Sequence, residues 1–459
     1  MELSGKRVLV VGLGKSGVAA AFFLKDKGAR VTVSDAKTED QLRELIPALL
    51  DRGIVVEAGH HGERTFRDQD LIVVSPGVPY HEPHLDQARA FGVPVIGEVE
   101  LAARFLQGPI AAITGSNGKT TTTALAGEVL AKGGLKTQVG GNIGKPVIEM
   151  IGGSTPATWN VLEISSFQLE TIETFHPKVA VILNITPDHL DRHRTFEGYV
   201  AAKARIFENQ TAADFAVLNL DDATCAALAQ QVKAKVVGFS RREAVKLGAY
   251  IRDGHIHYRD EKGEREVLAL SVIPLKGAHN QENVLATVCI AMLAGCQTAQ
   301  IAKTVSEFHA VEHRLEFVTA INGVQYYNDS KATNVDATIK ALESFPGGIH
   351  LILGGKDKGS DYSALNPLLR ERVKRVYTIG AAAARIEEQI AGATSVIHAE
   401  NIENAVRKAS ESAVKGDVVL LAPACASFDQ FQSYEHRGRA FKELVQALAA
   451  RKTPVGGVA

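Results

Sequence analysis

Short apolar, β-rich runs alternate with helical patterns along almost the whole chain. This alternation is typical of βαβ units and of largely parallel sheets, so the chain is expected to be an α/β protein. The expected strands of a first unit lie at 6–11, 29–34, 71–74 and 93–96. Those of a second unit begin at 110 and continue at 160–163, 179–183, 215–218 and 236–239. Those of a third unit lie at 350–353, 376–379 and 418–421.

Three other segments complete this pattern. Two short alternating runs within 247–273 flank a turn at 252–254 and predict hairpins. A helix is expected at 280–294 and another at 430–449. The chain therefore divides into three predicted domains. They are a Rossmann-like domain at 1–97, a central P-loop ATPase-type domain with a mostly parallel sheet at 98–310, and a C-terminal Rossmann-like α/β domain at 311–459.

Composition limits the class of protein. A chain of 459 residues with 45% hydrophobic and 22% charged residues fits about three globular domains. The formal net charge of −1 argues against non-specific nucleic-acid binding. No apolar run approaches the roughly 20 residues that a membrane helix needs, and the short N-terminal run is broken by glycines, unlike a signal peptide. The four cysteines have no CxxC or metal spacing, so a cytoplasmic location is expected.

The segment 110–123, IAAITGSNGKTTTT, carries the clearest chemical signal. An apolar run stops at a turn containing Gly115 and Gly118, and Lys119 then opens a helical stretch. Backbone N–H groups of such a turn, with a helix N-terminus, form a cradle for phosphate. The lysine neutralises phosphate charge and a following hydroxyl can bind Mg²⁺. Ile113 stands where the usual motif begins with glycine, yet the strand–turn–helix context favours ATP or GTP chemistry over an ordinary βα turn.

A second glycine-rich loop follows the first expected strand. Gly12, Gly14 and Gly17 have the spacing of a dinucleotide fingerprint, and Asp35 lies 18 residues after Gly17. This spacing is compatible with an NAD-dependent dehydrogenase. It is equally compatible with a UDP-linked ligand, because both present a diphosphate and a sugar. The second nucleotide loop at 115–121 has no place in a simple dehydrogenase and favours the UDP-linked ligand.

Further motifs accompany the phosphate loop TGSNGKTT in a fixed order. They are GNIG (141–144), EISSFQLE (163–170), NITPDHLDRH (184–193), EHRLE (312–316), YNDSKATN (327–334), LGGKDKG (353–359) and PACASFDQF (423–431). The ordered set closely resembles the Mur ligase family, which builds the peptide of peptidoglycan precursors. The YNDSKATN and PACASFDQF elements are most similar to the branch that adds D-glutamate. Folylpolyglutamate synthetases share the ATP core, but no nucleotide-type domain precedes it in them.

The resemblance implies an ATP-dependent amide ligase. A substrate carboxylate would attack the γ-phosphate of ATP to give an acyl phosphate, which the amine of an amino acid then attacks. The implied substrates are UDP-N-acetylmuramoyl-L-alanine, D-glutamate and ATP, and the protein is expected to be a monomer. The implied ATP-binding residues are Gly115, Ser116, Asn117, Gly118, Lys119, Thr120, Thr121, Asn280, His313, Arg314 and Asp329.

The same resemblance implies two Mg²⁺ sites. Their ligands would be Thr120, Glu163, His189 and Lys203, the last as a carbamate formed with CO₂. Taken alone, Glu163 also fits a surface carboxylate at a strand end, and His189 fits an ordinary loop histidine. His189 and His193 have a zinc-like spacing, but no third ligand is near. The helical pattern around Lys203, without the resemblance, predicts a solvated lysine. The implied catalytic residues are Lys119, Glu163, His189, Lys203 and Arg314.

Two substrate-binding sets follow from the family motifs. The UDP-sugar set is Lys15, Ser16, Asp35, Lys37, Gly77, Asn142 and His189. The amino-acid set is Thr333, Lys358, Ser427 and Tyr434. Two positions depart from the common pattern, which often has Arg at Lys37 and Phe at Tyr434. A flat bidentate contact is available to Arg but not to Lys.

Three functional alternatives remain at this point. The first is a ligase of the same superfamily with another amino acid or carboxylate substrate. The second is a nucleotide-gated binding protein that lacks ligase activity. The third is the dehydrogenase. Phosphate release from ATP with UDP-N-acetylmuramoyl-L-alanine and each candidate amino acid separates the ligases from the other two, and NAD binding with hydride transfer identifies a dehydrogenase.

Overall fold

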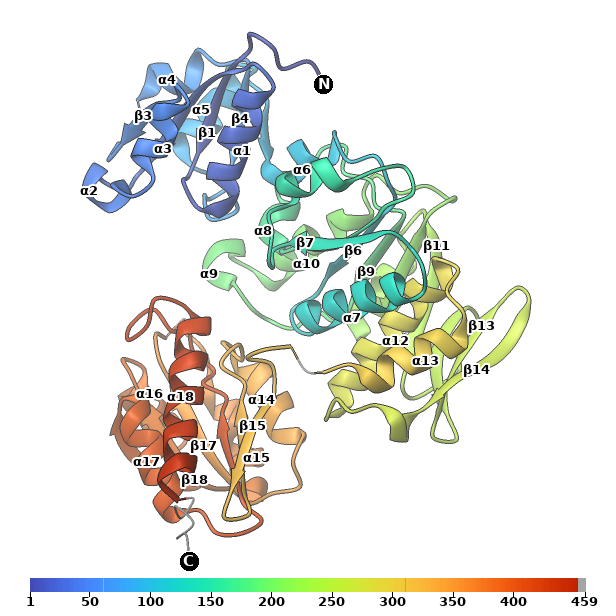
Figure 1. Cartoon of the computed structure of the whole chain (residues 1–459), viewed down its shortest axis with the longest axis vertical. Helices are drawn as coiled ribbons and strands as arrows, with labels where there is room; N and C mark the ends of the chain where they lie inside the picture. The colour runs from blue at the N-terminus through green and yellow to red at the C-terminus, as the bar shows by residue number, and fades with distance from the viewer. Residues whose placement is uncertain (61, 310, 358, 453–459) are drawn as a thin grey trace, which may run out of the picture. The chain divides into compact units, whose positions relative to one another are not determined.

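The computed structural model of the chain describes residues 1–60, 62–309, 311–357 and 359–452. It consists of two compact units. The first contains Met1–Val272 and Glu282–Ser306, and the second contains Ile273–Gln281 and the chain from Glu307 onward. Two sheets lie in the first unit and one in the second (Figure 1).

The N-terminal sheet has five parallel strands in the order β3-β2-β1-β4-β5. Along its central strand, Val8 and Val10 belong to one hydrophobic core, whereas Leu9 and Val11 belong to another. Helices therefore cover both faces of the sheet, as a parallel sheet requires. The strands are β1 (Arg7–Val11), β2 (Arg30–Asp35), β3 (Val55–Ala58), β4 (Leu71–Val74) and β5 (Val95–Gly97). The helices are α1 (Lys15–Asp26), α2 (Glu39–Leu42), α3 (Ile46–Asp51), α4 (Glu63–Arg67) and α5 (Pro83–Ala90).

The second sheet has nine strands in the order β14-β13-β12-β11-β10-β9-β6-β8-β7. Neighbours from β7 to β12 are parallel, and the last two strands form antiparallel hairpins. The strands are β6 (Ile110–Thr114), β7 (Thr137–Gly141), β8 (Trp159–Glu163), β9 (Val179–Ile182), β10 (Phe215–Asn219), β11 (Lys235–Ser240), β12 (Gly248–Arg252), β13 (His255–Asp260) and β14 (Gly263–Ala269).

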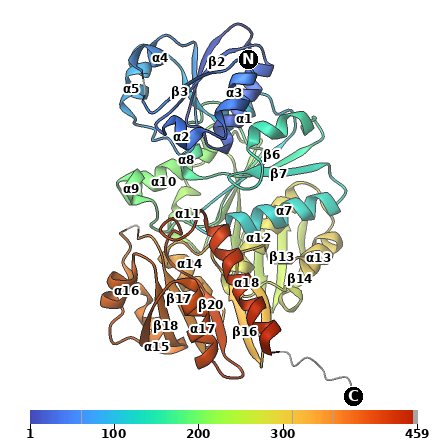
Figure 2. The same cartoon turned by 60° about the vertical axis from the view of Figure 1, so that its left-hand side comes forward.

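Helices and helical turns surround this sheet, and α7 packs along β6, β7 and β8 (Figure 2). They are α6 (Glu98–Ala103), α7 (Lys119–Lys132), η1 (Val147–Gly153), α8 (Ser166–Leu169), α9 (Leu190–His193), α10 (Phe196–Ala204), η2 (Arg205–Phe207), α11 (Ala223–Leu228), η3 (Leu270–Val272), α12 (Ala278–Leu293) and α13 (Thr298–Glu307). The phosphate loop, the EISSFQLE segment and the NITPDHLDRH segment follow β6, β8 and β9. These strands are adjacent and parallel, so the three segments leave the sheet at the same edge.

The third sheet has the order β15-β16-β20-β17-β18-β19, antiparallel only between its first two strands. Leu351 and Leu353 face one core and Ile352 the other, so helices cover both faces here as well. The strands are β15 (Glu316–Ile321), β16 (Val324–Asn328), β17 (Ile349–Gly354), β18 (Val373–Ile379), β19 (Ser395–Glu400) and β20 (Val418–Leu421). The helices are α14 (Val335–Glu343), η4 (Tyr362–Leu365), α15 (Asn366–Arg372), α16 (Ala383–Gln389), α17 (Ile402–Ser412) and α18 (Tyr434–Lys452).

The predicted α/β class with largely parallel sheets is confirmed. The sequence pattern missed β3, β7, β15, β16 and β19. Several of these strands lie at sheet edges and are partly exposed, so their hydrophobic signal is weak. The C-terminal helix begins at Tyr434 and not at 430, because Ser433 Oγ accepts a hydrogen bond from the backbone N–H of His436. The domain boundaries after residues 97 and 310 stay predictions.

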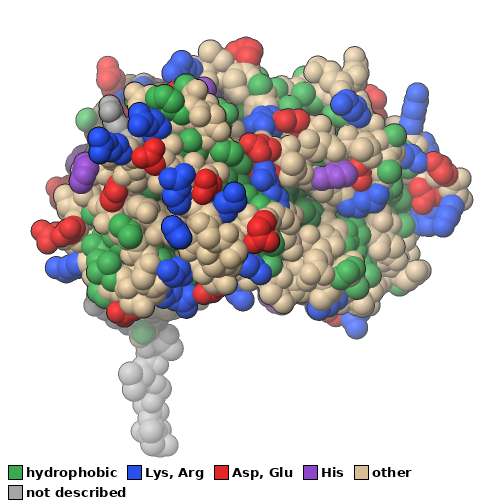
Figure 3. All heavy atoms as spheres, turned by 90° about the horizontal axis from the view of Figure 1, so that it is seen from above, with side chains coloured by type: hydrophobic (Ala, Val, Ile, Leu, Met, Phe, Trp, Pro, Cys, Tyr) green, Lys and Arg blue, Asp and Glu red, His purple; other side chains and the backbone are tan. Residues whose placement is uncertain are grey.

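Two surface properties agree with the composition. On the face drawn in Figure 3, basic and acidic side chains are intermixed and hydrophobic side chains are scattered. This mixture matches a formal net charge of −1. Throughout the described ranges, every helix is too short or too polar to cross a membrane.

Candidate active site

The phosphate loop joins β6 to α7, and its backbone conformation requires glycine. Gly118 has φ +85° and precedes the first helical residue, Lys119. A Cβ added at Gly118 would lie 2.2 Å from Asn283 Oδ1, so a larger residue fits neither the conformation nor the space. Because the first N–H groups of a helix have no partner within the helix, α7 directs donors and a positive dipole end at this loop. The local structure is therefore suited to bind phosphate.

Two lysines converge on one carbonyl of this loop. Lys119 Nζ donates to the carbonyl oxygens of Gly115 (2.7 Å) and Ser116 (2.8 Å). Lys203 Nζ, on α10, donates to the same Gly115 oxygen at 2.8 Å. Lys203 is only 1% exposed, so the solvated lysine predicted from helix periodicity alone is wrong. Burial, reinforced by the positive charge of Lys119, lowers the pKa of Lys203 well below its usual value.

Two residues that the sequence analysis did not single out support the loop. Asn184 accepts from the backbone N–H of Asn117 through Oδ1 (2.9 Å) and donates to its carbonyl through Nδ2 (3.2 Å). The Tyr199 hydroxyl lies 3.1 Å from Ser116 Oγ, and the Tyr199 ring lies under Lys203 Nζ. Tyr199 and Lys203 are four residues apart on one helix, a spacing that puts them on one face. This spacing relative to Lys203 was the sequence signal from which Tyr199 could have been identified.

A carboxylate ends the neighbouring strand β8. Glu163 is buried, and its Oε1 accepts from Asn142 Nδ2 at 2.8 Å. Its Oε2 is also buried and has no hydrogen-bond partner among the described residues. An unpartnered buried carboxylate oxygen is costly, and a bound cation would satisfy it. The buried hydroxyl of Thr120 in the first turn of α7 supplies another oxygen ligand of the type that Mg²⁺ prefers. Glu163 and Thr120 are therefore suited to hold Mg²⁺.

His189 follows β9 and has a left-handed backbone with φ 54°. Its ring packs edge-on against Phe167, with 4.8 Å between centroids, and its Nε2 lies 3.7 Å from Asp188 Oδ2. His193 is engaged elsewhere, since its Nε2 lies 2.9 Å from Ser166 Oγ and its Nδ1 lies 3.3 Å from a Glu170 oxygen. These contacts leave the zinc interpretation of the two histidines without support.

A cavity of about 590 Å³ opens at the carboxyl ends of β1 and β2 in the N-terminal sheet. Its lining includes five of the seven predicted UDP-sugar residues: Lys15, Ser16, Asp35, Lys37 and Gly77. The Asp35 carboxylate accepts from the backbone N–H groups of Leu13 (2.6 Å) and Lys37 (2.8 Å), so it also fixes the glycine-rich loop. The other two, Asn142 and His189, are not among the lining residues. Asn142 lies beside Glu163, and His189 lies beside Phe167.

Three of the four predicted nucleotide residues in the second unit carry a buried polar atom that lacks a hydrogen-bond partner among the described residues. These atoms are His313 Nε2, Arg314 Nε and Asp329 Oδ1. Burial raises the pKa of Asp329 to about 6, although the positive charge of Arg314 opposes the rise. Burial lowers the pKa of His313. Such unsatisfied groups are expected where a polar ligand binds.

A possible metal cluster beside His313 is already neutralised. Glu312, His313 and Glu316 bring their ligand atoms within 4.8 Å of one another. However, Lys442 Nζ donates to Glu312 (2.9 Å) and Glu316 (2.6 Å). The ammonium group therefore supplies the positive charge that a metal ion would bring.

The predicted amino-acid residues lie on two loops of the second unit. Thr333 belongs to the loop after β16, and buried Ser427 to the loop after β20. Arg437, fully buried in α18, joins these loops by donating to the carbonyls of Ser330 (2.8 Å) and Cys425 (3.1 Å).

Tyr434 and Lys331 also meet in this region. Tyr434 begins α18, and Lys331 Nζ lies 5.1 Å from the centre of its ring. The sequence analysis missed Lys331, although it stands in the YNDSKATN motif. Asn280 donates through Nδ2 to the Lys276 carbonyl at 2.6 Å. Lys358 lies outside the described residues.

Comparison with known proteins gives concordant matches. Three family models match the chain: a MurD-like N-terminal domain of Mur ligases at 6–97, the Mur ligase middle domain at 113–291, and the glutamate ligase domain of Mur ligases at 313–425. The chain is 66% identical to the UDP-N-acetylmuramoylalanine–D-glutamate ligase of Koribacter versatilis, covering 98% of this chain and 100% of that protein. It is 60% identical to the protein of the same name from Acidobacterium capsulatum, covering 97% of each.

Solved structures share the fold at low sequence identity. The UDP-N-acetylmuramate–alanine ligase MurC of Thermotoga maritima has a TM-score of 0.60 at 19% identity, covering 96% of this chain and 100% of that one. The MurF ligase of the same organism, solved with ADP, has a TM-score of 0.59 at 18% identity, covering 98% of this chain and 97% of that one.

Proposed function

The chain belongs to the Mur ligase family, and we propose that it joins D-glutamate to UDP-N-acetylmuramoyl-L-alanine with hydrolysis of ATP to ADP and phosphate. The observation that carries this proposal is the 66% identity, over 98% of the chain, to a ligase named for this reaction. The dehydrogenase alternative is abandoned, because membership of a ligase family overturns it. The product is a precursor for peptidoglycan, so the protein serves cell-wall synthesis.

Formation of the acyl phosphate brings two anions together. An oxygen of the L-alanine carboxylate attacks the γ-phosphorus of ATP, and ADP leaves. Lys119 and the loop residues from Gly115 to Thr121 hold the phosphates and offset their charge. In the second unit, Arg314 neutralises the γ-phosphate, Asp329 accepts from the ribose, and His313 and Asn280 hold the rest of the nucleotide. The buried, unpartnered atoms of His313, Arg314 and Asp329 support this assignment.

Two Mg²⁺ ions belong to this chemistry. Thr120 and Glu163 hold one, and His189 and a modified Lys203 hold the other. When bound, Mg²⁺ offsets the negative charge on the transferred phosphoryl group. The free Oε2 of Glu163 supports the first site.

Lys203 is converted to a carbamate in this proposal. The unprotonated amine attacks the carbon of CO₂ and then loses a proton, so a cation becomes a carboxylate-like anion. Only the neutral amine is nucleophilic, and the low pKa of buried Lys203 favours that form. Conversion also removes the repulsion between Lys203 and Lys119, whose ammonium groups share the Gly115 carbonyl.

The amide bond forms in a second attack. The amine nitrogen of D-glutamate attacks the acyl carbon, and phosphate leaves. Thr333, Lys358, Ser427 and Tyr434 bind the amino acid, while Lys15, Ser16, Asp35, Lys37, Gly77, Asn142 and His189 bind the UDP-sugar. The cavity at the glycine-rich loop supports the UDP assignment for five of these residues. In this proposal the protein acts in the cytoplasm, as a monomer and without nucleic acid.

Phosphate release from ATP tests the proposal. The purified chain is incubated with Mg²⁺, ATP and UDP-N-acetylmuramoyl-L-alanine, and D-glutamate, L-glutamate or D-alanine is added in separate reactions. We expect phosphate release only with D-glutamate, with one amide product per phosphate by mass spectrometry. Omission of the UDP-sugar is the control and should abolish release. Equal release with another amino acid, or release without amide product, would refute the proposal.

A further inference from the structure

Arg192 connects two segments that lie more than a hundred residues apart in sequence. Its Nη1 donates to the Pro76 carbonyl (3.0 Å) and its Nη2 donates to the Val78 carbonyl (3.0 Å). Its Nη2 also donates to Glu170 Oε2 at 2.6 Å, and its guanidinium stacks on the Phe167 ring at 4.2 Å. Its Nε donates to the same Glu170 oxygen at 3.2 Å, so the planar guanidinium group contacts four partners at once in a fixed arrangement that an ammonium group lacks.

One end of this connection is a wall of the nucleotide cavity. Pro76, Gly77 and Val78 line the cavity that we assign to the UDP group. Ser75 Oγ donates to the Gly12 carbonyl at 2.7 Å, which ties the same segment to the glycine-rich loop. A ligand that orders residues 75–78 thereby orders the two carbonyls that Arg192 binds.

The other end is the segment that carries His189. Arg192 lies three residues later, on the single turn α9. Glu170 accepts from Arg192 and also lies 3.3 Å from His193 Nδ1, so α9 is docked through both side chains. Phe167 packs against His189 as well as against Arg192. The position of the His189 ring therefore depends on the same contacts that hold Arg192.

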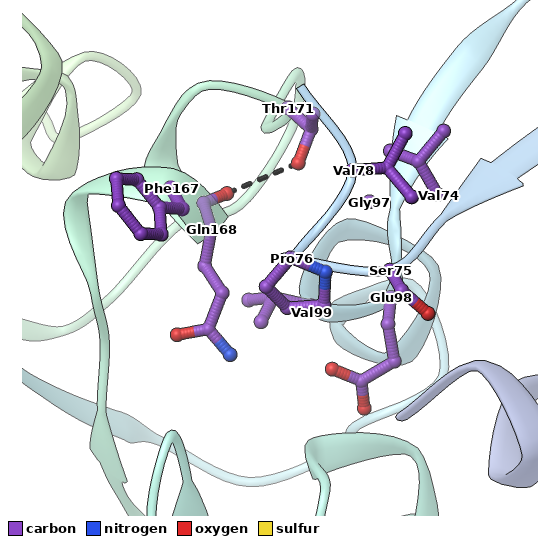
Figure 4. A pocket seen from close by; sticks show the side chains of 10 residues that line it. All are labelled: Val74, Ser75, Pro76, Val78, Gly97, Glu98, Val99, Phe167, Gln168 and Thr171. Atoms are coloured by element: carbon purple, nitrogen blue, oxygen red, sulfur yellow. Dashed lines mark hydrogen bonds between the residues drawn. The ribbon is translucent and has the colours of Figure 1, made fainter. Parts of the chain in front are cut away.

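A small cavity lies where residues 74–78 meet the segment 167–171, which carries Phe167 and Glu170, the two side chains that contact Arg192. Figure 4 shows Pro76 and Val78 on one side of a small cavity, with Phe167, Gln168 and Thr171 on the other. Its volume is about 10 Å³, roughly the space of one water-sized probe. Residues 76–78 therefore pack beside the residues that hold Arg192, so both ends of the connection belong to one packed region.

We propose that Arg192 is a positioning residue that couples occupancy of the nucleotide cavity to the placement of His189. This inference rests on the proposed function, because it takes the cavity ligand to be the UDP-sugar and His189 to serve the reaction. Arg192 touches neither substrate in this proposal. It fixes residues 75–78 for the nucleotide and the α9 turn for the reacting groups.

Three variants test this role. Arg192→Met keeps much of the aliphatic length but removes the charge and all donors, and Arg192→Lys keeps the ion pair with Glu170 but cannot bind both carbonyls. Arg205→Met is the matched control. Arg205 also donates to carbonyls at the end of α8, those of Leu169, Glu170 and Ile172, but the structure gives it no hydrogen bond to residues 75–78. Melting temperatures identify any variant that fails to fold.

The measurements are binding of UDP-N-acetylmuramoyl-L-alanine by titration calorimetry and amide hydrogen exchange at residues 189–194. In the wild type, the UDP-sugar should slow exchange at these residues. We expect both Arg192 variants to lose this slowing and to bind at least about tenfold more weakly, since two charge-assisted hydrogen bonds are lost. Arg205→Met should keep the slowing and bind within about twofold of the wild type.

Two outcomes separate the inference from the proposed function. In the first, the wild type makes the amide while the Arg192 variants keep both the slowed exchange and the wild-type affinity. That result refutes the role of Arg192 and leaves the proposed function standing. Arg192→Lys makes this outcome decisive even where Arg192→Met unfolds. If the wild type makes no amide, the proposed function fails, whatever the exchange data show.

Discussion

Glu98→Gln should remove a pH-dependent loss of stability from the first unit. Glu98 opens α6, is 1% exposed, and lies at the edge of the cavity in Figure 4. Its Oε1 accepts from the backbone N–H of Ile148 at 2.6 Å, but its Oε2 is buried without a partner among the described residues. Burial, only partly opposed by the bond from Ile148, raises the pKa of Glu98 from 4.5 to about 7.

The sign and size of the effect follow from this pKa. Between pH 4.5 and about 7 the folded state holds a proton that the unfolded state has lost, so stability falls as the pH rises. From pH 5 to pH 8 the wild type should lose about 2–3 kcal/mol through this carboxyl group. Gln does not titrate. Its amide still accepts from Ile148, and its unpartnered NH₂ group costs about 1–3 kcal/mol at every pH.

The prediction therefore concerns a change between two pH values. The free energy of unfolding of Glu98→Gln minus that of the wild type should rise by about 2–3 kcal/mol from pH 5 to pH 8. The measurement is urea unfolding followed by fluorescence of Trp159, the single tryptophan, which lies on β8 in the same unit.

Glu100→Gln is the matched control, two residues away on the same helix. Burial raises the pKa of Glu100, but N–H groups of Glu173 and Thr174, the Thr174 hydroxyl and Arg104 outweigh burial and lower it overall. Its contribution to stability is present above its unfolded pKa and is lost as the pH falls through its folded pKa. Glu100→Gln should therefore destabilise the unit most at pH 8, the opposite of Glu98→Gln. If the free energy of unfolding of Glu98→Gln minus that of the wild type is the same at pH 5 and pH 8, the reasoning is refuted.

Three further substitutions test the proposed reaction. Lys119→Ala should lower phosphate release at least about a thousandfold, while calorimetry shows unchanged UDP-sugar affinity; loss of that affinity in a folded variant would contradict the assignment. Lys203→Ala should be nearly inactive and regain part of its phosphate release with formate, because a small carboxylate replaces the carbamate; full activity without formate would end that proposal. Glu163→Gln should raise the Mg²⁺ concentration needed for half-maximal rate at least about tenfold, since an anionic ligand is lost; an unchanged Mg²⁺ titration would exclude Glu163 as a ligand.

The sequence by itself determined the architecture and the chemistry of single segments. The α/β class was predictable because buried parallel strands such as β4 and β6 are continuous apolar runs, and this signal is local. The phosphate loop could also be predicted, because its glycines and Lys119 act through backbone conformation and charge within a few residues. The partly exposed edge strands β3 and β19 were missed, because their pattern is weak over so short a length.

Only the tertiary structure decided which of these segments act together. Helix periodicity placed Lys203 in solvent, whereas packing under the phosphate loop buries it beside Lys119. Asn142 meets Glu163 because β7 and β8 are neighbours in the sheet. The link from Arg192 to residues 76–78 likewise has no trace in sequence spacing. Burial, pKa shifts and long-range hydrogen bonds depend on what the fold brings within a few ångströms, and local patterns carry no information on that distance.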